Sequence, residues 1–286
     1  MSDWGQGAKN NNIGWGQGAV NNDISWGAVH ADSWSGDTDI VGGVSFDTDY
    51  QAVLDYATTQ GYTLPSDSQK LLQNQLLIDL KTAGVWDKLD TFANFATDGS
   101  SNFALIDWKR LSQYTAVNSP TFTTNVGFLT NGTSSYINTN KTPGTNFTLN
   151  SASEFKWVNN VIDNLSGNVS SGARGTLGSN IYELTGSIVS VNSIGTAGFS
   201  SNVLAGFRHI DRKNSTTIER FVNGVVSSLS QNSTFVVDRV PFIGCFNNGL
   251  ASGFESNSFS FYGFGASLSS ESSNLYNAIN TYKNSI

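Results

Sequence analysis

The stretch Thr217-Ile218-Glu219-Arg220-Phe221-Val222-Asn223-Gly224-Val225-Val226 decides the fold class of this 286-residue chain. Runs of β-branched and aromatic residues lie on both sides of Asn223-Gly224, as the strands of a hairpin require. Both central residues of a type I′ turn need a positive φ, and Asn-Gly meets that need at the least steric cost. The stretch therefore predicts an antiparallel β-hairpin.

Similar runs recur from about residue 100 almost to the C-terminus, separated by Asn, Gly and Ser. They are 103–108, 136–137, 154–158, 188–191, 203–208, 235–237, 241–246 and 258–264. In the last run, Phe259 and Phe261 alternate with small or polar residues, which predicts one face in a core and one face outside. Nine or more strands without intervening helices predict a mainly β fold, a two-sheet antiparallel sandwich over residues 99–286.

Helical spacing appears before and after the sandwich. Residues 48–98 are predicted to form a small helical module with three helices. The first lies around Val53–Ala57, the second begins at Leu64-Pro65-Ser66-Asp67, and a short third runs from Val85 to Phe95. The chain is predicted to end in a helix that Ser269 or Ser270 caps, with Leu275, Tyr276, Ile279 and Tyr282 on its apolar side.

The N-terminal residues 1–47 are predicted to form an extended docking arm and linker. Trp4-Gly5-Gln6-Gly7-Ala8 recurs as Trp15-Gly16-Gln17-Gly18-Ala19 and in part as Trp26-Gly27-Ala28. The many Gly and Asn residues between them oppose a helix. An extended arm cannot bury large indole rings against itself. We therefore expect docking on a partner protein through Trp4, Ile13, Trp15, Ile24, Trp26 and Trp34, the alternative being a low-complexity disordered tail.

Charge and composition exclude several classes of protein. The net charge is −7, and residues 1–50 carry seven Asp against Lys9, which leaves a nearly neutral remainder. Nucleic-acid binding needs a basic surface, so we expect no nucleic-acid partner. There is no run of eighteen apolar residues and no leader pattern, so we expect neither membrane insertion nor a signal peptide. The single cysteine, Cys245, excludes an intrachain disulfide and is predicted to be a buried thiol.

The sequence predicts no catalytic residue, no metal site and no cofactor. Asp37-Thr38-Asp39 and Asp47-Thr48-Asp49 do not match a helix–loop–helix calcium loop, and one of residues 47–49 is expected to cap a helix. His30 and His209 are the only histidines, and the carboxylates after residue 100 form no recognisable hydrolase pair. The mixed polar cluster His209, Asp211 and Arg212 is predicted to lie at a strand end and in an exposed loop, as a candidate glycan contact.

Two resemblances add to these predictions. The repeated Trp-Gly-Gln-Gly-Ala text with Asn10-Asn11-Asn12-Ile13-Gly14 between its copies resembles the N-terminal arms of tailed-bacteriophage virion proteins, particularly fibre and surface proteins of phages of the Bacteroidetes lineage. The layout around Phe261-Tyr262-Gly263-Phe264-Gly265 and the helix after it resembles the concanavalin-A-like (laminin-G-like) jelly-roll module of phage fibres and adhesins. In lectin and glucanase relatives the concave sheet holds sugar-binding aromatics or catalytic carboxylates. The Glu-x-Asp-x-x-Glu motif of the hydrolases is missing here.

We therefore expect a non-enzymatic bacteriophage virion protein, a head or tail fibre or a decoration protein. The resemblance implies that residues 1–47 attach it to capsid, portal, neck or tail proteins. Its lectin-like domain would contact host-surface glycans. We expect synthesis in the host cytoplasm, a place on the particle surface, and a homo-oligomer, with a trimer favoured because fibres are often trimers. Two alternatives stay open: a purely structural collar or decoration protein, and a glycan depolymerase.

Overall fold

The computed structural model describes residues 40–41, 44–161, 169–184, 188–198 and 205–286. The chain divides into two compact units, Met1–Phe46 and Asp47–Ile286. In the first unit, strands β1 (Ile40–Val41) and β2 (Val44–Ser45) pair antiparallel. The predicted docking residues Trp4, Ile13, Trp15, Ile24, Trp26 and Trp34 lie outside the described residues, and their role stays a prediction.

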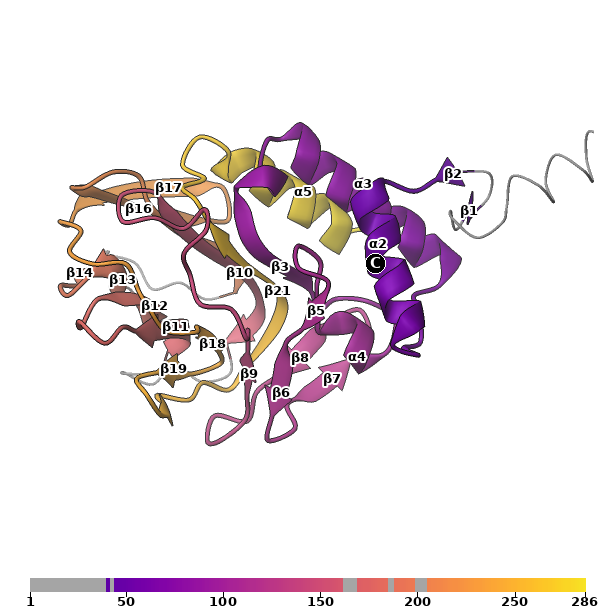
Figure 1. Ribbon diagram of the computed structural model, residues 1–286, viewed down its shortest axis with the longest axis horizontal. Coiled ribbons are helices and arrows are strands. Elements are labelled where there is room, and N and C mark those ends of the chain that lie inside the picture. Colours follow the sequence, from indigo (N-terminus) through magenta and orange to yellow (C-terminus); the bar gives the residue numbers. More distant parts are fainter. Residues whose placement is uncertain (1–39, 42–43, 162–168, 185–187, 199–204) are drawn as a thin grey trace, which may run out of the picture. The chain divides into compact units, whose positions relative to one another are not determined.

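The second unit contains two large sheets that confirm the predicted sandwich (Figure 1). The first sheet has the order β17-β16-β15-β10-β21-β8-β7, and β3 also pairs with β21. Its strands are β3 (Leu89–Asn94), β7 (Thr121–Thr123), β8 (Gly127–Leu129), β10 (Ala152–Val161), β15 (Gly206–Arg212), β16 (Thr217–Val222), β17 (Val225–Ser230) and β21 (Asn257–Gly265). All its described pairs are antiparallel.

The second sheet has the order β14-β13-β12-β11-β18-β9-β6, with β19 pairing β11 and β20. Its strands are β6 (Thr115–Val117), β9 (Tyr136–Asn138), β11 (Val169–Arg174), β12 (Asn180–Leu184), β13 (Ile188–Ser193), β14 (Ala197–Gly198), β18 (Phe242–Ile243), β19 (Phe246–Asn247) and β20 (Ala251–Ser252). The β11–β19 contact is parallel, unlike the other described pairs of this sheet. A further small pair joins β4 (Ile106–Asp107) to β5 (Ser112–Gln113).

The hairpin predicted at Asn223-Gly224 is confirmed. Val222, the last residue of β16, pairs with Val225, the first residue of β17. Only the two turn residues lie between them. Asn223 has a φ of 47° and Gly224 a φ of 94°, so both lie in the left-handed region that a type I′ turn uses.

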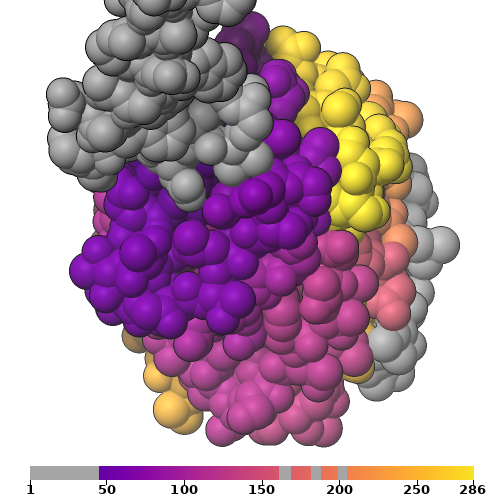
Figure 2. Space-filling model, turned by 90° about the vertical axis from the view of Figure 1, so that its right-hand side faces the viewer, coloured from indigo at the N-terminus to yellow at the C-terminus, as the bar shows by residue number. Residues whose placement is uncertain are grey.

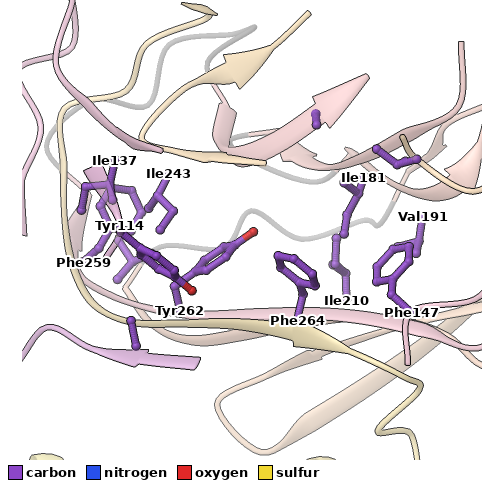
Figure 3. Close-up of a cluster of buried hydrophobic side chains, with 14 of the residues drawn as sticks. Tyr114, Ile137, Phe147, Ile181, Val191, Ile210, Ile243, Phe259, Tyr262 and Phe264 are labelled. Atoms are coloured by element: carbon purple, nitrogen blue, oxygen red, sulfur yellow. The ribbon is translucent and has the colours of Figure 1, made fainter. Parts of the chain in front are cut away.

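The core between the two sheets is made of apolar side chains from both. Figure 3 shows Ile210 of β15 with Tyr262 and Phe264 of β21 on one side. Ile137, Ile181 and Ile243 of β9, β12 and β18 face them from the second sheet. All of these side chains are 0% or 1% exposed. Each fully buried aliphatic or aromatic side chain stabilises the fold by roughly 1.5–3 kcal/mol, so this layer holds the sheets together.

The predicted alternation in β21 is wrong, because the whole strand Asn257–Gly265 is buried. Opposite β10, Phe261 pairs with Trp157 and Phe259 pairs with Val158, which leaves Ser260 as an extra residue. Such a β-bulge changes the face on which the following side chains lie. Phe259 consequently shares the core between the sheets with Tyr262. Phe261 packs elsewhere, 6.2 Å from the Phe92 ring and 5.7 Å from the Tyr282 ring.

Three of the predicted helices are confirmed, namely α2 (Thr48–Thr59), α3 (Asp67–Thr82) and α5 (Ser272–Lys283). Asp47 caps α2 by accepting a hydrogen bond from the Asp49 backbone N–H, and Ser66 caps α3. The cap residue of α5 is Glu271 instead of the predicted Ser269 or Ser270. Asp47 and Asp49 also bind Lys81 Nζ, at 2.6 and 2.7 Å. These carboxylates therefore serve helix packing.

The predicted third helix is wrong. Its residues form a 3₁₀ turn, η1 (Trp86–Lys88), followed by strand β3, which pairs with β21 from Leu89 to Asn94. All six residues of β3 are buried. The sequence of this strand therefore lacks the alternation of polar and apolar residues that marks a half-exposed strand. The predicted helical region 48–98 thus contributes a strand to the first sheet.

Two predicted strands also differ from the structure. Residues 103–108 contribute to a short helix, α4 (Ser101–Ala104), and to the two-residue strand β4. Residues 235–237 form no strand, and their backbone instead follows Asn192, whose side-chain oxygen accepts from the Val237 N–H at 3.2 Å. Cys245, between β18 and β19, is buried as predicted. Burial raises the pKa of its thiol to about 12, so it stays protonated at neutral pH.

Helices α3 and α5 lie on the side of the first sheet that faces away from the second sheet (Figure 1). Figure 2 shows α5, in yellow, beside the indigo N-terminal helices. Phe261 and Phe207 of the sheet contact Tyr282 and Tyr276 of α5, at ring distances of 5.7 Å in both cases. No helix in the described part of the chain is long and apolar enough to span a membrane.

Candidate functional site

The outer side of the second sheet carries three neighbouring aromatic side chains. Because Ile137 and Ile243 point into the core, strand alternation places their neighbours Tyr136 and Phe242 on the opposite face. The two rings lie 4.5 Å apart at 32°, and Phe254, before β21, lies 6.3 Å from Tyr136. We call Tyr136, Phe242 and Phe254 the aromatic face. No described helix lies over this side of the second sheet in Figure 1.

The three rings of the aromatic face differ in exposure. Phe242 is 9% exposed and forms its base, whereas Tyr136 and Phe254 are half-buried and reach the solvent. Burial, followed by the nearby Cys245, raises the pKa of the Tyr136 phenol. Its O–H therefore stays protonated at neutral pH and is available as a hydrogen-bond donor. The face thus combines flat apolar surface with a polar group at its edge, as amphipathic aromatic side chains do.

A polar turn leads directly into Tyr136. The Asn131 side-chain oxygen accepts hydrogen bonds from the backbone N–H groups of Thr133, Ser134 and Ser135, at 3.0, 2.9 and 2.9 Å. The turn packs next to Ser256, since a Cβ added at Gly132 would lie 3.2 Å from the Ser256 Cβ. This places the turn beside the segment that holds Phe254. The exposed Asn131 and Thr133 form a neutral, hydroxyl- and amide-bearing rim.

The chemistry of this arrangement suits a neutral polyhydroxylated ligand. The C–H face of a sugar ring packs on aromatic rings, while its hydroxyl groups hydrogen-bond to amides and hydroxyls at the rim. The described residues contain no group of three His, Cys, Asp or Glu side chains placed to hold a metal ion. The rings and the polar turn offer binding through stacking and neutral hydrogen bonds.

The predicted glycan contacts His209, Asp211 and Arg212 are not in an exposed loop, so that expectation is wrong. All three lie within β15 and are 1%, 1% and 0% exposed. His209 Nδ1 lies 3.0 Å from the Ser272 hydroxyl, and its Nε2 lies 3.3 Å from Asp211 Oδ2. Asp211 accepts hydrogen bonds from the Ser267 hydroxyl and the Leu268 N–H, each at 2.6 Å. Both residues thereby hold the start of α5 on the first sheet.

Arg212 projects from β15 in the other direction. Its Nε donates to the Val191 carbonyl at 3.0 Å, and its Nη2 donates to Gln231 Oε1 at 2.8 Å. Burial lowers the pKa of this guanidinium to about 10, which still leaves it charged at neutral pH. Arg212 thus ties the first sheet to β13 of the second. None of the three residues reaches a ligand on the surface.

One carboxylate of the sandwich lies between the two sheets. Glu154 of β10 is 1% exposed, and its Oε1 accepts from the Tyr262 hydroxyl at 2.7 Å and the Ser171 hydroxyl at 2.5 Å. Burial, reinforced by the negative charge of Glu154, raises the pKa of Tyr262 well above its usual value, so the phenol remains a donor. Because this carboxylate is buried, it is placed to join the sheets and not to attack a polymer.

The aromatic face was not predicted as a site. Tyr136 and Phe242 belong to segments that are predicted as strands. Their apolar neighbours Ile137 and Ile243 indicate that one face of each strand packs in the core. The missing information was the pairing of β9 with β18, which joins residues more than a hundred positions apart. Without that pairing, nothing in the sequence brings the two rings together.

A scan against protein-family models finds no match for this chain, and a search of curated proteins finds no significant relative. Among solved structures, the chain is similar to the botulinum neurotoxin serotype D binding domain, with 12% identity and a TM-score of 0.44, over 70% of this chain and 52% of that one. It is similar to Trypanosoma rangeli sialidase in complex with sialic acid, with 11% identity and a TM-score of 0.44, over 74% and 40%.

A third likeness is to domain 4 of an extracellular arabinanase from Geobacillus stearothermophilus in complex with arabinotriose, with 15% identity and a TM-score of 0.39, over 66% of this chain and 98% of that one. The chain spans about half or less of the length of the first two structures. All three TM-scores lie below 0.5.

Proposed function

We propose that this chain is a non-enzymatic bacteriophage virion surface protein that attaches the particle to host-surface glycans. Its N-terminal residues 1–47 anchor it to other virion proteins, and its sandwich displays the aromatic face to the host. The observation that carries the glycan-binding part is the half-buried pair Tyr136 and Phe254 over Phe242, beside a neutral polar turn, on a side of the sheet with no described helix. The repeated Trp-Gly-Gln-Gly-Ala text supports the anchoring part.

The side chains and the charge of residues 1–47 suit an anchor. Trp4, Trp15 and Trp26 stand eleven residues apart, so an extended arm would present large apolar rings to its partner at regular intervals. Residues 1–50 carry seven Asp and one Lys, which favours a groove with basic residues along it. A periodic arm fits a partner surface that repeats, as assemblies of identical virion subunits do.

Multivalency makes weak sugar contacts sufficient. A shallow aromatic face with a neutral rim gives modest affinity for one glycan, because little of the ligand is enclosed. Many copies of the protein can be displayed on one particle, either as trimers or as separately anchored chains. Once one copy has bound a glycan, binding by the others becomes intramolecular. The overall affinity then rises by a factor of roughly 10²–10⁴ without any new contact.

The direct test is glycan-array binding by the full-length protein, wild type against Tyr136→Ala. We expect binding of the wild type to at least one glycan class, and a loss of about tenfold or more in the variant, because a central aromatic contact at an interface contributes about 1–2 kcal/mol. The folded state should be unchanged by circular dichroism, since Tyr136 is half-buried and its ring faces outward.

Val226→Ala is the matched control, since Val226 is 56% exposed on the hairpin of the other sheet. It should bind like the wild type. Absence of wild-type binding to every glycan, or equal binding by Tyr136→Ala, would contradict the assignment of the aromatic face.

A purely structural collar or decoration protein is the second candidate, and one observation favours it. Leu177, Ile194 and Phe235 are 64%, 60% and 45% exposed at one end of the sandwich. Their segments adjoin, because the Ile194 N–H donates to Thr234 Oγ1 at 3.1 Å and the Ser179 hydroxyl donates to the Val236 carbonyl at 3.4 Å. Clustered exposed apolar side chains mark protein contacts. Normal incorporation into particles without any glycan binding would favour this role.

A further inference from the structure

A pocket lies on the helical side of the molecule, away from the aromatic face. The C-terminal part of α3 and the outer side of α5 border a cavity of about 330 Å³ that is wide open to solvent. Five polar side chains line it: Asp79 and Thr82 from α3, and Asn274, Asn277 and Thr281 from α5. We call this cavity the α3–α5 pocket. Figure 2 shows the side of the molecule where yellow α5 meets the indigo helices.

The sequence of α5 builds one wall of the pocket. Asn274, Asn277 and Thr281 follow at intervals of three and four residues, so they share one face of the helix. Leu275 and Ile279 occupy the opposite face and are 0% exposed. The small side chain of Ala278, which is 6% exposed and also lines the pocket, leaves room between the two helices. The buried face of α5 thereby fixes the helix, and with it the polar residues that line the pocket.

The pocket has free hydrogen-bonding capacity. Among the described residues, the side chains of Thr82, Asn274, Asn277 and Thr281 make no hydrogen bond to another protein group. Asp79 Oδ1 accepts one from Gln75 Nε2 at 2.8 Å, and its second carboxylate oxygen remains available to a ligand. Two amides, two hydroxyls and a carboxylate therefore direct donors and acceptors toward the same space.

The charge of the pocket narrows the class of ligand. No Lys or Arg lines it, and both Asp79 and the C-terminal end of α3 disfavour anions. An apolar ligand would leave the amides and hydroxyls without partners. A neutral ligand with several hydroxyl groups satisfies all five side chains, and a carboxylate accepts hydrogen bonds from two neighbouring hydroxyls. The volume is at the lower end of the roughly 300–1,000 Å³ of small-molecule sites.

We propose that the α3–α5 pocket is a second saccharide site, which takes a single sugar unit with neighbouring free hydroxyl groups. Its chemistry is independent of the aromatic face, while its biological role rests on the proposed function of glycan attachment. Two sites on different sides of one chain would let one copy engage two branches of a glycan surface. The aromatic face binds through stacking, whereas this pocket binds through hydrogen bonds alone.

The test uses saturation-transfer difference NMR on the full-length protein. The probes are the methyl glycosides of glucose, galactose, mannose and N-acetylglucosamine, with inorganic phosphate, followed through its ³¹P signal, as the anionic probe. We expect at least one glycoside to bind, and Asn277→Ala to weaken it by at least about fivefold through loss of amide hydrogen bonds. Asp79→Asn keeps the shape but removes the strong acceptor, and should weaken the same glycoside. A deoxy analogue lacking one of the neighbouring hydroxyls should bind less well than its parent.

Tyr136→Ala separates this inference from the proposed function. Glycoside binding that survives Tyr136→Ala and is weakened by Asn277→Ala supports the pocket. Glycoside binding lost in Tyr136→Ala and unchanged in Asn277→Ala overturns the pocket while supporting the aromatic face. Absence of any glycoside binding, or binding of phosphate that Asn277→Ala removes, also overturns it. Asn277 is exposed, so the variant should keep the wild-type fold.

Discussion

Replacing Asp107 with alanine should lower the free energy of unfolding by about 3–5 kcal/mol, the usual cost of removing one partner from a buried ion pair. Asp107 is 0% exposed, and its carboxylate binds Arg110 Nε at 2.5 Å. It also accepts from the backbone N–H groups of Phe92 at 3.2 Å and Lys109 at 3.0 Å. The Thr91 hydroxyl is a further donor. Alanine would leave these groups without their acceptor.

The network around Asp107 joins distant parts of the chain. Thr91, which binds Asp107, also lies 2.5 Å from the Tyr114 hydroxyl. Burial, followed by the charge of Asp107, raises the pKa of Tyr114 well above its usual value, so this phenol stays a donor. Arg110 continues the network by donating from Nη2 to the Thr139 carbonyl at 2.9 Å. Loss of Asp107 therefore loosens β3, the β4–β5 pair and the segment after β9 together.

Urea unfolding followed by tryptophan fluorescence measures this effect, because Trp86 and Trp108 are buried nearby. Asp67→Ala is the control: its carboxylate is 73% exposed and binds Lys70 at 3.3 Å on the surface, where a pair contributes about 0–1 kcal/mol. Asp107→Asn keeps the shape and should fall between the two. Equal stability of Asp107→Ala and Asp67→Ala would contradict the structural role of the network.

Phe92→Ala is expected to cost about 3–5 kcal/mol, as removal of a fully buried Phe side chain does. Phe92 is 0% exposed and lies in β3, on the side of the first sheet that packs on the helices. Its ring is 5.5 Å from Trp108, 6.0 Å from Trp86 and 6.2 Å from Phe155. The cavity left by alanine would remove apolar contacts from all these rings at once.

The same unfolding measurement applies to Phe92→Ala, with Phe235→Ala as its control, since Phe235 is 45% exposed and should change stability by less than about 0.5 kcal/mol. The result also tests the correction to the sequence prediction. If β3 is part of the sandwich, Phe92→Ala should weaken a single cooperative transition. A separate early transition, with the rest of the unit unaffected, would show that residues 48–98 unfold as an independent module.

Local signals predicted the parts of the fold that local geometry determines. Asn223-Gly224 specified its hairpin, because positive φ values at both turn residues are a local requirement. Ser66 marked the start of α3, because a side-chain cap acts on backbone groups within one turn. Gly61, with a φ of 71°, follows the end of α2. In each case the residues that decide the structure are neighbours in the chain.

The errors arose where a distant partner decides the structure. Val85 to Phe95 has apolar residues that suit a helix, but β21, more than 160 residues later, pairs with this segment, and both faces of the resulting strand are buried. Such a strand has no alternation that sequence analysis can detect. In β21 itself, the bulge at Ser260 shifts Phe261 away from the core of Phe259. That shift depends on the pairing with β10.

The candidate sites show the same limit. His209, Asp211 and Arg212 have charges that suggest a surface loop, yet Ser272, Ser267 and Val191 supply their buried partners from other elements. The aromatic face needs the pairing of β9 with β18, and the α3–α5 pocket needs the packing of two helices nearly 200 residues apart. The docking role of residues 1–47, which is inferred from a repeat visible in the sequence, stays a prediction.

The central claim is that residues 1–47 anchor this protein to a virus particle, and one binding measurement tests it most directly. Full-length protein, wild type or with Trp4, Trp15 and Trp26 all changed to Ala, is mixed with particles assembled without it, and co-sedimentation measures the bound fraction. We predict that the triple variant binds more than about 100-fold less tightly, since buried Trp side chains are strong interface anchors, while Tyr136→Ala binds particles like the wild type. Equal binding by the triple variant and the wild type would contradict the account.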